Sequence, residues 1–143
     1  MQAGRRKRRR SLYTVRMEPQ HDYQIAIDVE TRYLEDQSKP AEDLYCFAYT
    51  IGIRNAGRLP AQLLARRWEV VDANGEVREV VGDGVVGEQP RILPGERFEY
   101  TSGACLKTPW GSMEGAYRMR GDDGTEFEAP IPRFALCVPR VLH

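Results

Sequence analysis

Cysteine and histidine are scarce in this sequence, and their scarcity excludes several classes of enzyme. The 143 residues include three cysteines and two histidines, and no two cysteines form a C-x-x-C pair. Neither a structural zinc site nor a thioredoxin-type motif is therefore expected. His21 and His143 lie near opposite ends of the chain, so a serine or cysteine nucleophile would have to draw its base from a terminus. We expect a non-enzymatic protein that holds no metal or other cofactor.

Long hydrophobic runs are also absent. The longest uncharged apolar stretch covers residues 44–53, well short of the ~18–20 residues that a membrane-spanning helix needs. Polar residues interrupt the chain directly after its basic start, which is unlike a secretory signal peptide. We therefore expect a soluble, cytoplasmic protein. In that reducing compartment Cys46, Cys105 and Cys137 are expected to be free thiols.

The net charge of zero conceals an uneven distribution. Six basic residues occupy positions 5–10, whereas residues 11–143 carry 15 basic and 21 acidic residues, a net charge of −6. An acidic body is a poor starting point for a nucleic-acid-binding fold, although the basic run itself could contact phosphates or anionic lipid. We interpret residues 1–16 as a disordered basic arm, and Met17 as an alternative start of translation.

Apolar and polar residues alternate with a period of two along most of the remaining chain. Seven such segments are separated by glycine, proline, asparagine or aspartate, and no convincing amphipathic helix interrupts them. The segments are residues 23–29, 47–53, 63–71, 77–81, 97–101, 113–119 and 127–131. This pattern predicts an all-β fold, an immunoglobulin-like or fibronectin type III-like β-sandwich of about seven antiparallel strands. A small closed barrel is the alternative.

Several single residues suggest structural roles. Asn74-Gly75 predicts a tight hairpin, because both residues tolerate positive φ, and Pro94-Gly95 predicts a type II turn. Trp68 is expected between the sheets. Tyr117 could form a tyrosine corner, with its hydroxyl fixing the adjacent crossover. Residues 121–126 carry three carboxylates, which are interpreted as part of a solvated hairpin turn rather than as a cation site.

Residues 82–87 read G-x-G-x-x-G, a pattern that also occurs in dinucleotide-binding folds. Those folds place a helix directly after the glycines, whereas Pro90 and Pro94 prevent a helix here. The glycines are therefore expected to shape a bulge and a sharp corner, or to leave backbone N–H groups free for an anion. Trp110, between Pro109 and Gly111, is expected at a loop tip, where it could contact a partner.

Longer strings in the sequence resemble the ApaG family. They occupy residues 33–40 (YLEDQSKP), 47–57 (FAYTIGIRNAG), 63–75 (LLARRWEVVDANG), 82–117 (which contains VVGEQP, PGERFEYTSG and GSMEGAY) and 131–134 (IPRF). The resemblance implies one ApaG domain over residues 17–141 with a fibronectin type III-like or immunoglobulin-like sandwich. The basic arm departs from the family pattern. So does Arg67, where histidine or an aromatic residue is common, and this puts in doubt any metal role for that strand.

The resemblance also implies a function in general terms. ApaG-like proteins are linked to cobalt resistance and magnesium efflux, and related eukaryotic domains look like protein-binding modules. We therefore expect a binding module with an indirect link to Co²⁺ resistance and Mg²⁺ efflux. Its candidate contact residues are those of the glycine-rich loop together with the loop tryptophan: Gly82, Gly84, Gly87, Glu88, Gln89 and Trp110. The alternative is a sensor of a small anion, such as pyrophosphate or a metal–nucleotide complex, that uses the same glycines.

Overall fold

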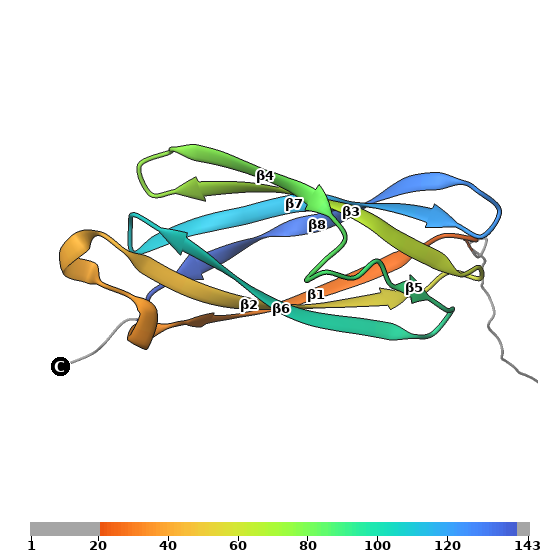
Figure 1. Ribbon diagram of the computed structural model, residues 1–143, viewed down its shortest axis with the longest axis horizontal. Helices are drawn as coiled ribbons and strands as arrows, with labels where there is room; N and C mark the ends of the chain where they lie inside the picture. Colours follow the sequence, from red (N-terminus) through yellow and green to blue (C-terminus); the bar gives the residue numbers. More distant parts are fainter. Residues whose placement is uncertain (1–20, 140–143) are drawn as a thin grey trace, which may run out of the picture.

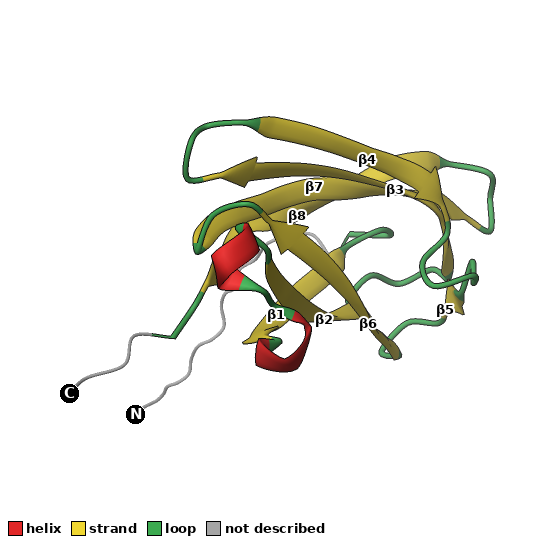
Figure 2. Cartoon of the chain, turned by 60° about the vertical axis from the view of Figure 1, so that its left-hand side comes forward, coloured by secondary structure: helices red, strands yellow, loops and turns green. Residues whose placement is uncertain are grey.

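The computed structural model describes residues 21–139. Two antiparallel sheets face each other as the two layers of a sandwich (Figures 1 and 2). The three-stranded sheet has the order β1-β2-β6, and it contains β1 (Ile25–Tyr33), β2 (Tyr45–Asn55) and β6 (Arg97–Leu106). The second sheet has the order β4-β3-β7-β8, with β5 paired to the start of β3. It contains β3 (Ala61–Asp72), β4 (Val77–Asp83), β5 (Arg91–Ile92), β7 (Trp110–Gly121) and β8 (Glu126–Cys137).

The predicted β-sandwich is confirmed, and the barrel alternative is wrong because the two sheets remain separate. All seven predicted segments fall on strands, although β1 begins at Ile25, two residues later than predicted. The eighth strand, β5, has only two residues, too few to show a period in the sequence. The helical segments within residues 21–139 are two 3₁₀ turns, Glu35–Gln37 and Pro40–Glu42. None of the helical segments in this part of the chain is long and apolar enough to cross a bilayer. The predicted basic arm, 1–16, and both predicted ends of the domain, 17 and 141, lie outside the described residues.

Trp68 packs at the centre of the core, as predicted. It is 2% exposed and lies in the second half of β3, where buried positions alternate with half-buried or exposed ones over residues 67–72. The indole meets three aromatic rings edge-on, with centroids 5.4–6.4 Å away, those of Tyr49, Tyr117 and Phe134. Such edge-to-face pairs add about 0.5–1.5 kcal/mol each beyond the burial of apolar area. The two sheets therefore meet around a single aromatic cluster.

Both predicted turns are present. Gly95 has φ +85°, and the Glu96 amide donates to the Leu93 carbonyl, as a type II turn requires. The hairpin after β3 is present, but its loop has three residues, and only Gly75, at φ +83°, takes a positive φ. The predicted hairpin is therefore confirmed, with the glycine alone in the positive-φ conformation. The Asp72 carboxylate holds this loop by accepting the amides of Asn74 and Glu76 at 2.9 Å.

Two of the cysteines are paired, and this corrects the expectation that all three are free thiols. Cys46 on β2 and Cys105 on β6 are directly opposite in the register of the three-stranded sheet and form a disulfide. Cys137 on β8 is the free cysteine within residues 21–139, and it is exposed. The two paired cysteines are 59 positions apart in the sequence, and the sequence did not indicate that they lie opposite each other, because the register depends on how β2 and β6 pair.

Candidate functional site

The glycine-rich loop, residues 82–89, leaves the end of β4 and makes a tight turn. The backbones of Val85 and Glu88 exchange both of their N–H···O hydrogen bonds, at 2.8 and 2.9 Å. Between them, Val86 and Gly87 both take positive φ, +43° and +82°. These are the features of a type I′ turn. The loop then continues through Pro90 into β5 and no helix follows, so the geometry of a dinucleotide-binding fold is absent.

Two glycines of this loop have steric reasons to be glycine. A Cβ atom at Gly84 would lie 2.3 Å from the Glu88 carbonyl oxygen, and the residue also has φ +61°. A Cβ atom at Gly82 would lie 3.0 Å from the guanidinium of Arg66. That guanidinium bridges the loop to β3, since its Nη1 donates to the carbonyls of Asp83 at 3.0 Å and Gly84 at 2.9 Å. The shape of the loop thus accounts for the glycine pattern.

The loop is anchored at both ends and exposed at its tip. Val85 is fully buried in the core. The Gln89 side-chain amide donates to the Leu64 carbonyl at 2.8 Å, which gives this predicted contact residue a structural bond. Val86 is 55% exposed, and Glu88 is also exposed. A β-branched residue at positive φ is a rare conformation, because its side chain crowds the backbone. Sequence reasoning did not single out Val86, and the adjacent glycine was the only available signal.

The loop offers few free amides to an anion. The N–H groups of Gly84, Val85 and Glu88 already donate to the carbonyls of Leu64, Glu88 and Val85. An anion-binding nest needs successive amides that are free to point at the ligand. The N–H groups of Val86 and Gly87, which are successive and lie at the exposed tip, donate to no carbonyl of the described residues, so they are the amides of this loop that an anion could use.

Trp110 lies far from the glycine-rich loop. It is the first residue of β7, opposite Cys137 of β8, rather than the tip of a loop, and 55% of it is exposed. The neighbouring Gly111 pairs with Asp72 at one end of β3, whereas Asp83 pairs with Ala65 near the other end. Seven residues of strand separate these two points, roughly 23 Å at 3.3 Å per residue. The structure does not bring Trp110 and the glycine-rich loop into one surface.

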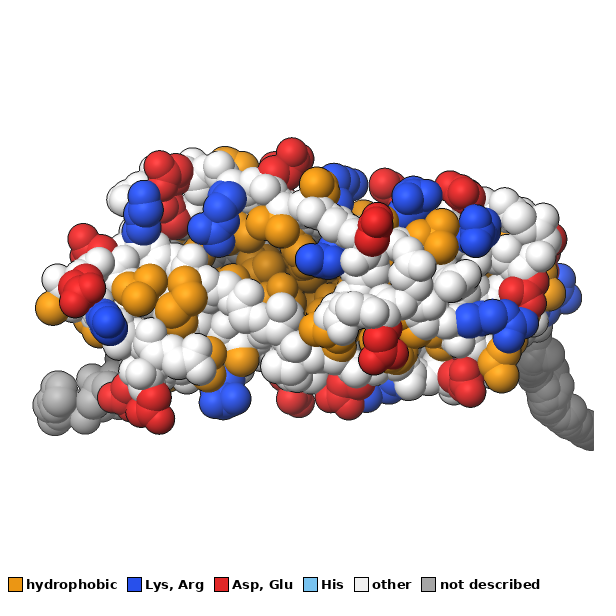
Figure 3. Space-filling view, in the orientation of Figure 1, with side chains coloured by type: hydrophobic (Ala, Val, Ile, Leu, Met, Phe, Trp, Pro, Cys, Tyr) orange, Lys and Arg blue, Asp and Glu red, His pale blue; other side chains and the backbone are white. Residues whose placement is uncertain are grey.

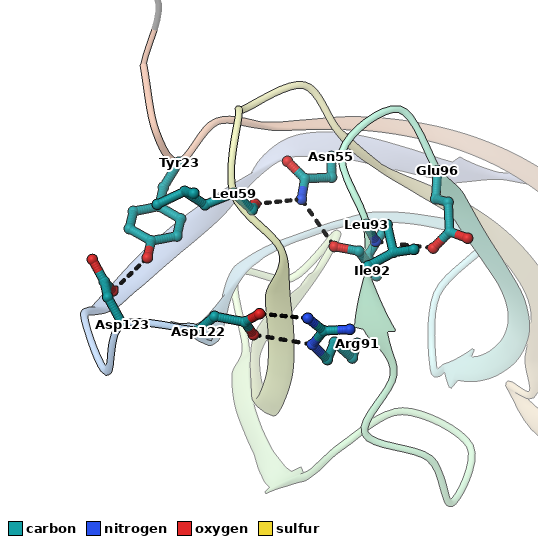
Figure 4. Close-up of polar contacts among 9 residues, drawn as sticks. All are labelled: Tyr23, Asn55, Leu59, Arg91, Ile92, Leu93, Glu96, Asp122 and Asp123. Atoms are coloured by element: carbon teal, nitrogen blue, oxygen red, sulfur yellow. Dashed lines mark hydrogen bonds and ion pairs between the residues drawn. The ribbon is translucent and has the colours of Figure 1, made fainter.

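A network of polar contacts closes the end of the sandwich opposite Trp110 (Figure 4). Asn55, 1% exposed, donates from Nδ2 to the carbonyls of Leu59 and Ile92, both at 2.9 Å, and accepts the amide of Gly57 through Oδ1. This single amide therefore fixes the loops that follow β2 and β5. A buried side chain of this kind supplies hydrogen bonds to loop groups that have lost their contact with water.

The carboxylates of residues 121–126 take part in the same closure. Asp122 pairs with Arg91, and Asp123 accepts the Tyr23 hydroxyl. The hydrogen bond from Arg91 lowers the pKa of Asp122, and the hydrogen bond from Tyr23 lowers the pKa of Asp123. Within residues 21–139, no three histidine, cysteine, aspartate or glutamate side chains are grouped to hold a metal ion. These carboxylates fasten the hairpin between β7 and β8 to its neighbours.

A cleft opens between the edges of the two sheets, where β4 faces β6. Figure 3 shows hydrophobic side chains gathered in a hollow there, with Lys and Arg side chains at its margin. The cavity has a volume of about 200 Å³. Its lining includes Tyr49, Trp68 and Met113, and two arginines, Arg66 and Arg78.

Trp68, which lines this cleft, carries an unsatisfied polar group. Its Nε1 is the one buried side-chain nitrogen or oxygen within residues 21–139 that has no hydrogen-bond partner. Leaving a buried donor unpaired costs about 1–3 kcal/mol. The sequence did not predict that this donor and the two arginines lie together. They come from two strands, β3 and β4, and the alternation of apolar and polar residues does not show that the edge between the two sheets is open.

Tyr117 joins the two sheets instead of forming the tyrosine corner that was expected. Its hydroxyl is hydrogen-bonded to that of Tyr100, at 2.5 Å, and not to an upstream backbone group. Burial raises the pKa of both phenols, and the proximity of Tyr100 raises that of Tyr117 further. Both phenolic hydroxyls therefore keep their protons in the folded core.

Comparison with known proteins identifies proteins that are similar to this chain in sequence and in structure. A family model described as the ApaG domain matches residues 35–121. The chain is 56% identical over 121 residues to Protein ApaG of Ralstonia nicotianae, covering 85% of this chain and 98% of the relative. It is 55% identical over 127 residues to Protein ApaG of Stenotrophomonas maltophilia, covering 89% of this chain and 100% of the relative. A crystal structure of a Bordetella pertussis protein superposes with a TM-score of 0.83 at 47% identity, covering 86% of this chain and all of that one.

Proposed function

This chain belongs to the ApaG family, and we propose that it is a non-enzymatic protein-binding module whose contact surface is the tip of the glycine-rich loop, residues 86–88. The sandwich holds this tip rigidly through the buried Val85 and the bond from Gln89 to Leu64. A rigid scaffold that presents an exposed loop is the usual arrangement of binding surfaces on β-sandwiches.

The backbone conformation and the exposure of Val86 are the main support for this proposal. This residue is a valine at φ +43° with more than half of its side chain in solvent, so it neither relaxes the turn nor fills the core. Asparagine or glycine would be easier at this position of a type I′ turn. Backbone strain of this kind persists where the residue has another role, and an apolar side chain at a loop tip suits a contact with a protein.

The described residues also favour a binding role over catalysis. The histidine within residues 21–139, His21, is exposed at the start of the described chain. The unpaired cysteine, Cys137, is exposed on β8, and its Sγ donates to the Val138 carbonyl at 3.4 Å. No acid–base partner of the kind that activates a nucleophile accompanies either residue among these contacts. The implied link to Co²⁺ resistance and Mg²⁺ efflux would then act through the bound protein.

Val86→Asn tests the proposal, with Val77→Asn as a matched control because Val77, on β4, is 57% exposed. Partners captured from the native cell by the immobilised wild-type protein are identified, purified and titrated against each variant. We expect Val86→Asn to raise the melting temperature, because it relieves the turn, and to weaken partner binding at least about tenfold. Val77→Asn should bind like the wild type. Undiminished binding by Val86→Asn would reject the loop tip as the contact surface.

Substitutions of Glu88 and Gln89 distinguish a side chain that contacts the partner from a side chain that supports the loop. Glu88→Ala should leave the melting temperature unchanged and weaken partner binding, because the exposed carboxylate makes no hydrogen bond to another described side chain. Gln89→Ala should lower the melting temperature, because it leaves the Leu64 carbonyl without that donor. If both variants bind normally once folded, the polar side chains of the loop are not part of the interface.

A further inference from the structure

We propose that the cleft between β4 and β6 is a binding site for a small aromatic carboxylate, with the ring held between the sheets and the carboxylate held by Arg66 and Arg78. The site is distinct from the loop tip of the proposed function. It lies on the inner faces of the two sheets, whereas Val86 is at the exposed turn beyond β4.

The walls of the cleft suit an apolar ring. Tyr49 and Trp68 contribute aromatic surface from opposite sheets, and Met113 and Val70 contribute aliphatic surface. The hydrophobic hollow is visible between the two layers in Figure 3. A cavity of about 200 Å³ that is open to solvent has room for one or two fused rings, because a closed apolar cavity of roughly 150 Å³ already binds benzene.

The charge at the cleft indicates an anion. Arg66 and Arg78 both line the cavity, and none of the residues that line it is acidic. Neither arginine belongs to any of the ion pairs found within residues 21–139, although seven such pairs occur there. Arg66 uses Nη1 for the two loop carbonyls, and Arg78 donates from Nη2 to the Cys105 carbonyl at 3.4 Å. Each guanidinium has five N–H donors, so both keep donors for a carboxylate.

The indole N–H of Trp68 is buried beside the cleft and has no hydrogen-bond partner. Buried polar groups in folded proteins almost always have a partner, and this is the one exception among the buried side-chain atoms of residues 21–139. The exception falls on a residue that lines the cleft. A ligand that settles beside the indole changes its surroundings, so the N–H also serves as a spectroscopic reporter.

The test uses the ¹⁵N-labelled full chain, whose two indole N–H signals come from Trp68 and Trp110. Titration with 2-naphthoate should shift the Trp68 signal saturably and leave the Trp110 signal unchanged. The uncharged analogue 2-naphthylmethanol should bind at least about tenfold more weakly, because it cannot pair with the arginines. Equal affinity for the two compounds, or no shift of the Trp68 signal at millimolar naphthoate, would overturn the proposal.

Variants locate the site. Arg78→Gln removes one cation from an exposed position and should weaken naphthoate binding several-fold. Arg67→Gln is the matched control, because Arg67 lies on the outer face of β3 and pairs with Glu128 at 3.6 Å; it should bind like the wild type. Ser102→Phe, which fills the cleft from β6, should abolish binding while the melting temperature shows that the chain still folds. Unchanged affinity in both Arg78→Gln and Ser102→Phe would place the naphthoate elsewhere and refute the assignment. Partner capture by the loop tip is measured separately, so the two proposals can fail independently.

Discussion

The hydroxyl groups of Tyr100 and Tyr117 lie 2.5 Å apart and share a hydrogen bond that joins the three-stranded sheet to the five-stranded sheet. Both rings are buried, at 6% and 0% exposure, among apolar side chains of the core. Each hydroxyl gives the other the partner that a buried phenol requires. The contact therefore fixes how the two layers face each other as well as filling the space between them.

Because of this pair, we expect the free energy of unfolding to change with pH in the alkaline range. Unfolded tyrosine has a pKa of about 10, and burial raises the pKa of both phenols in the folded protein. The folded state thus holds these protons more tightly, so their contribution is fully present below about pH 10 and is lost as the pH rises beyond it. Urea unfolding between about pH 9 and pH 11 should show a steep loss of stability that is smaller in the Tyr100→Phe/Tyr117→Phe double variant. An identical slope in the double variant would contradict this assignment.

The two tryptophans should differ sharply in their contribution to stability. Trp68→Ala should lower the free energy of unfolding by about 3–5 kcal/mol, the range for removal of a large aromatic side chain from a packed core. Trp110→Ala should change it by less than about 0.5 kcal/mol, because Trp110 is 55% exposed. Chemical denaturation of the two variants side by side measures this. Equal losses would show that Trp110 packs as part of the core.

Asn55 should be the most sensitive polar residue at the end of the sandwich shown in Figure 4. Asn55→Ala leaves two carbonyls and one amide without their partner, and we expect a loss of about 2–3 kcal/mol. The control is Asn74→Ala in the exposed turn after β3, which should cost less than about 0.5 kcal/mol. Comparable effects of the two substitutions in urea unfolding would mean that the network contributes little.

Substitutions of Gly84 and Gly87 distinguish the effect of steric crowding on stability from the effect of backbone conformation. Both residues have positive φ, but a Cβ atom at Gly87 would have no neighbour within 4 Å, whereas one at Gly84 would meet the Glu88 carbonyl. Gly84→Ala should therefore be more destabilising than Gly87→Ala by at least about 1 kcal/mol. Thermal unfolding of the two variants measures this difference. If Gly87→Ala were the more destabilising variant, the close approach of Gly84 to the Glu88 carbonyl would be contradicted.

The disulfide between Cys46 and Cys105 can be tested by counting thiols. Titration of the denatured, unreduced protein should detect one thiol per chain, that of Cys137. After reduction and removal of the reductant, the same assay should detect three, the number of cysteines in the sequence. Three thiols before reduction would restore the expectation of free cysteines that the sequence suggested.

Features that depend on near neighbours in the chain could be read from the sequence. The first residues of segment 63–71 suited a helix equally well, and the Asn74-Gly75 turn signal after it predicted a strand, with Trp68 facing the core. Pro94-Gly95 predicted a type II turn, because glycine takes the positive φ that this turn needs and proline pre-sets the preceding residue. The sandwich itself followed from the number and spacing of such segments.

Features that depend on contacts between distant segments were decided by the tertiary structure. The register of β2 against β6 placed Cys46 opposite Cys105, and the facing of the two sheets joined Tyr100 to Tyr117. The length of β3 separated Trp110 from the glycine-rich loop, although both had seemed suited to one binding surface. The open edge between β4 and β6 brought Arg66 and Arg78 to one cleft. Local propensity and periodicity specify which face of a strand is buried, but they carry no information on which strand lies opposite, and that choice is made by packing and register across the whole fold.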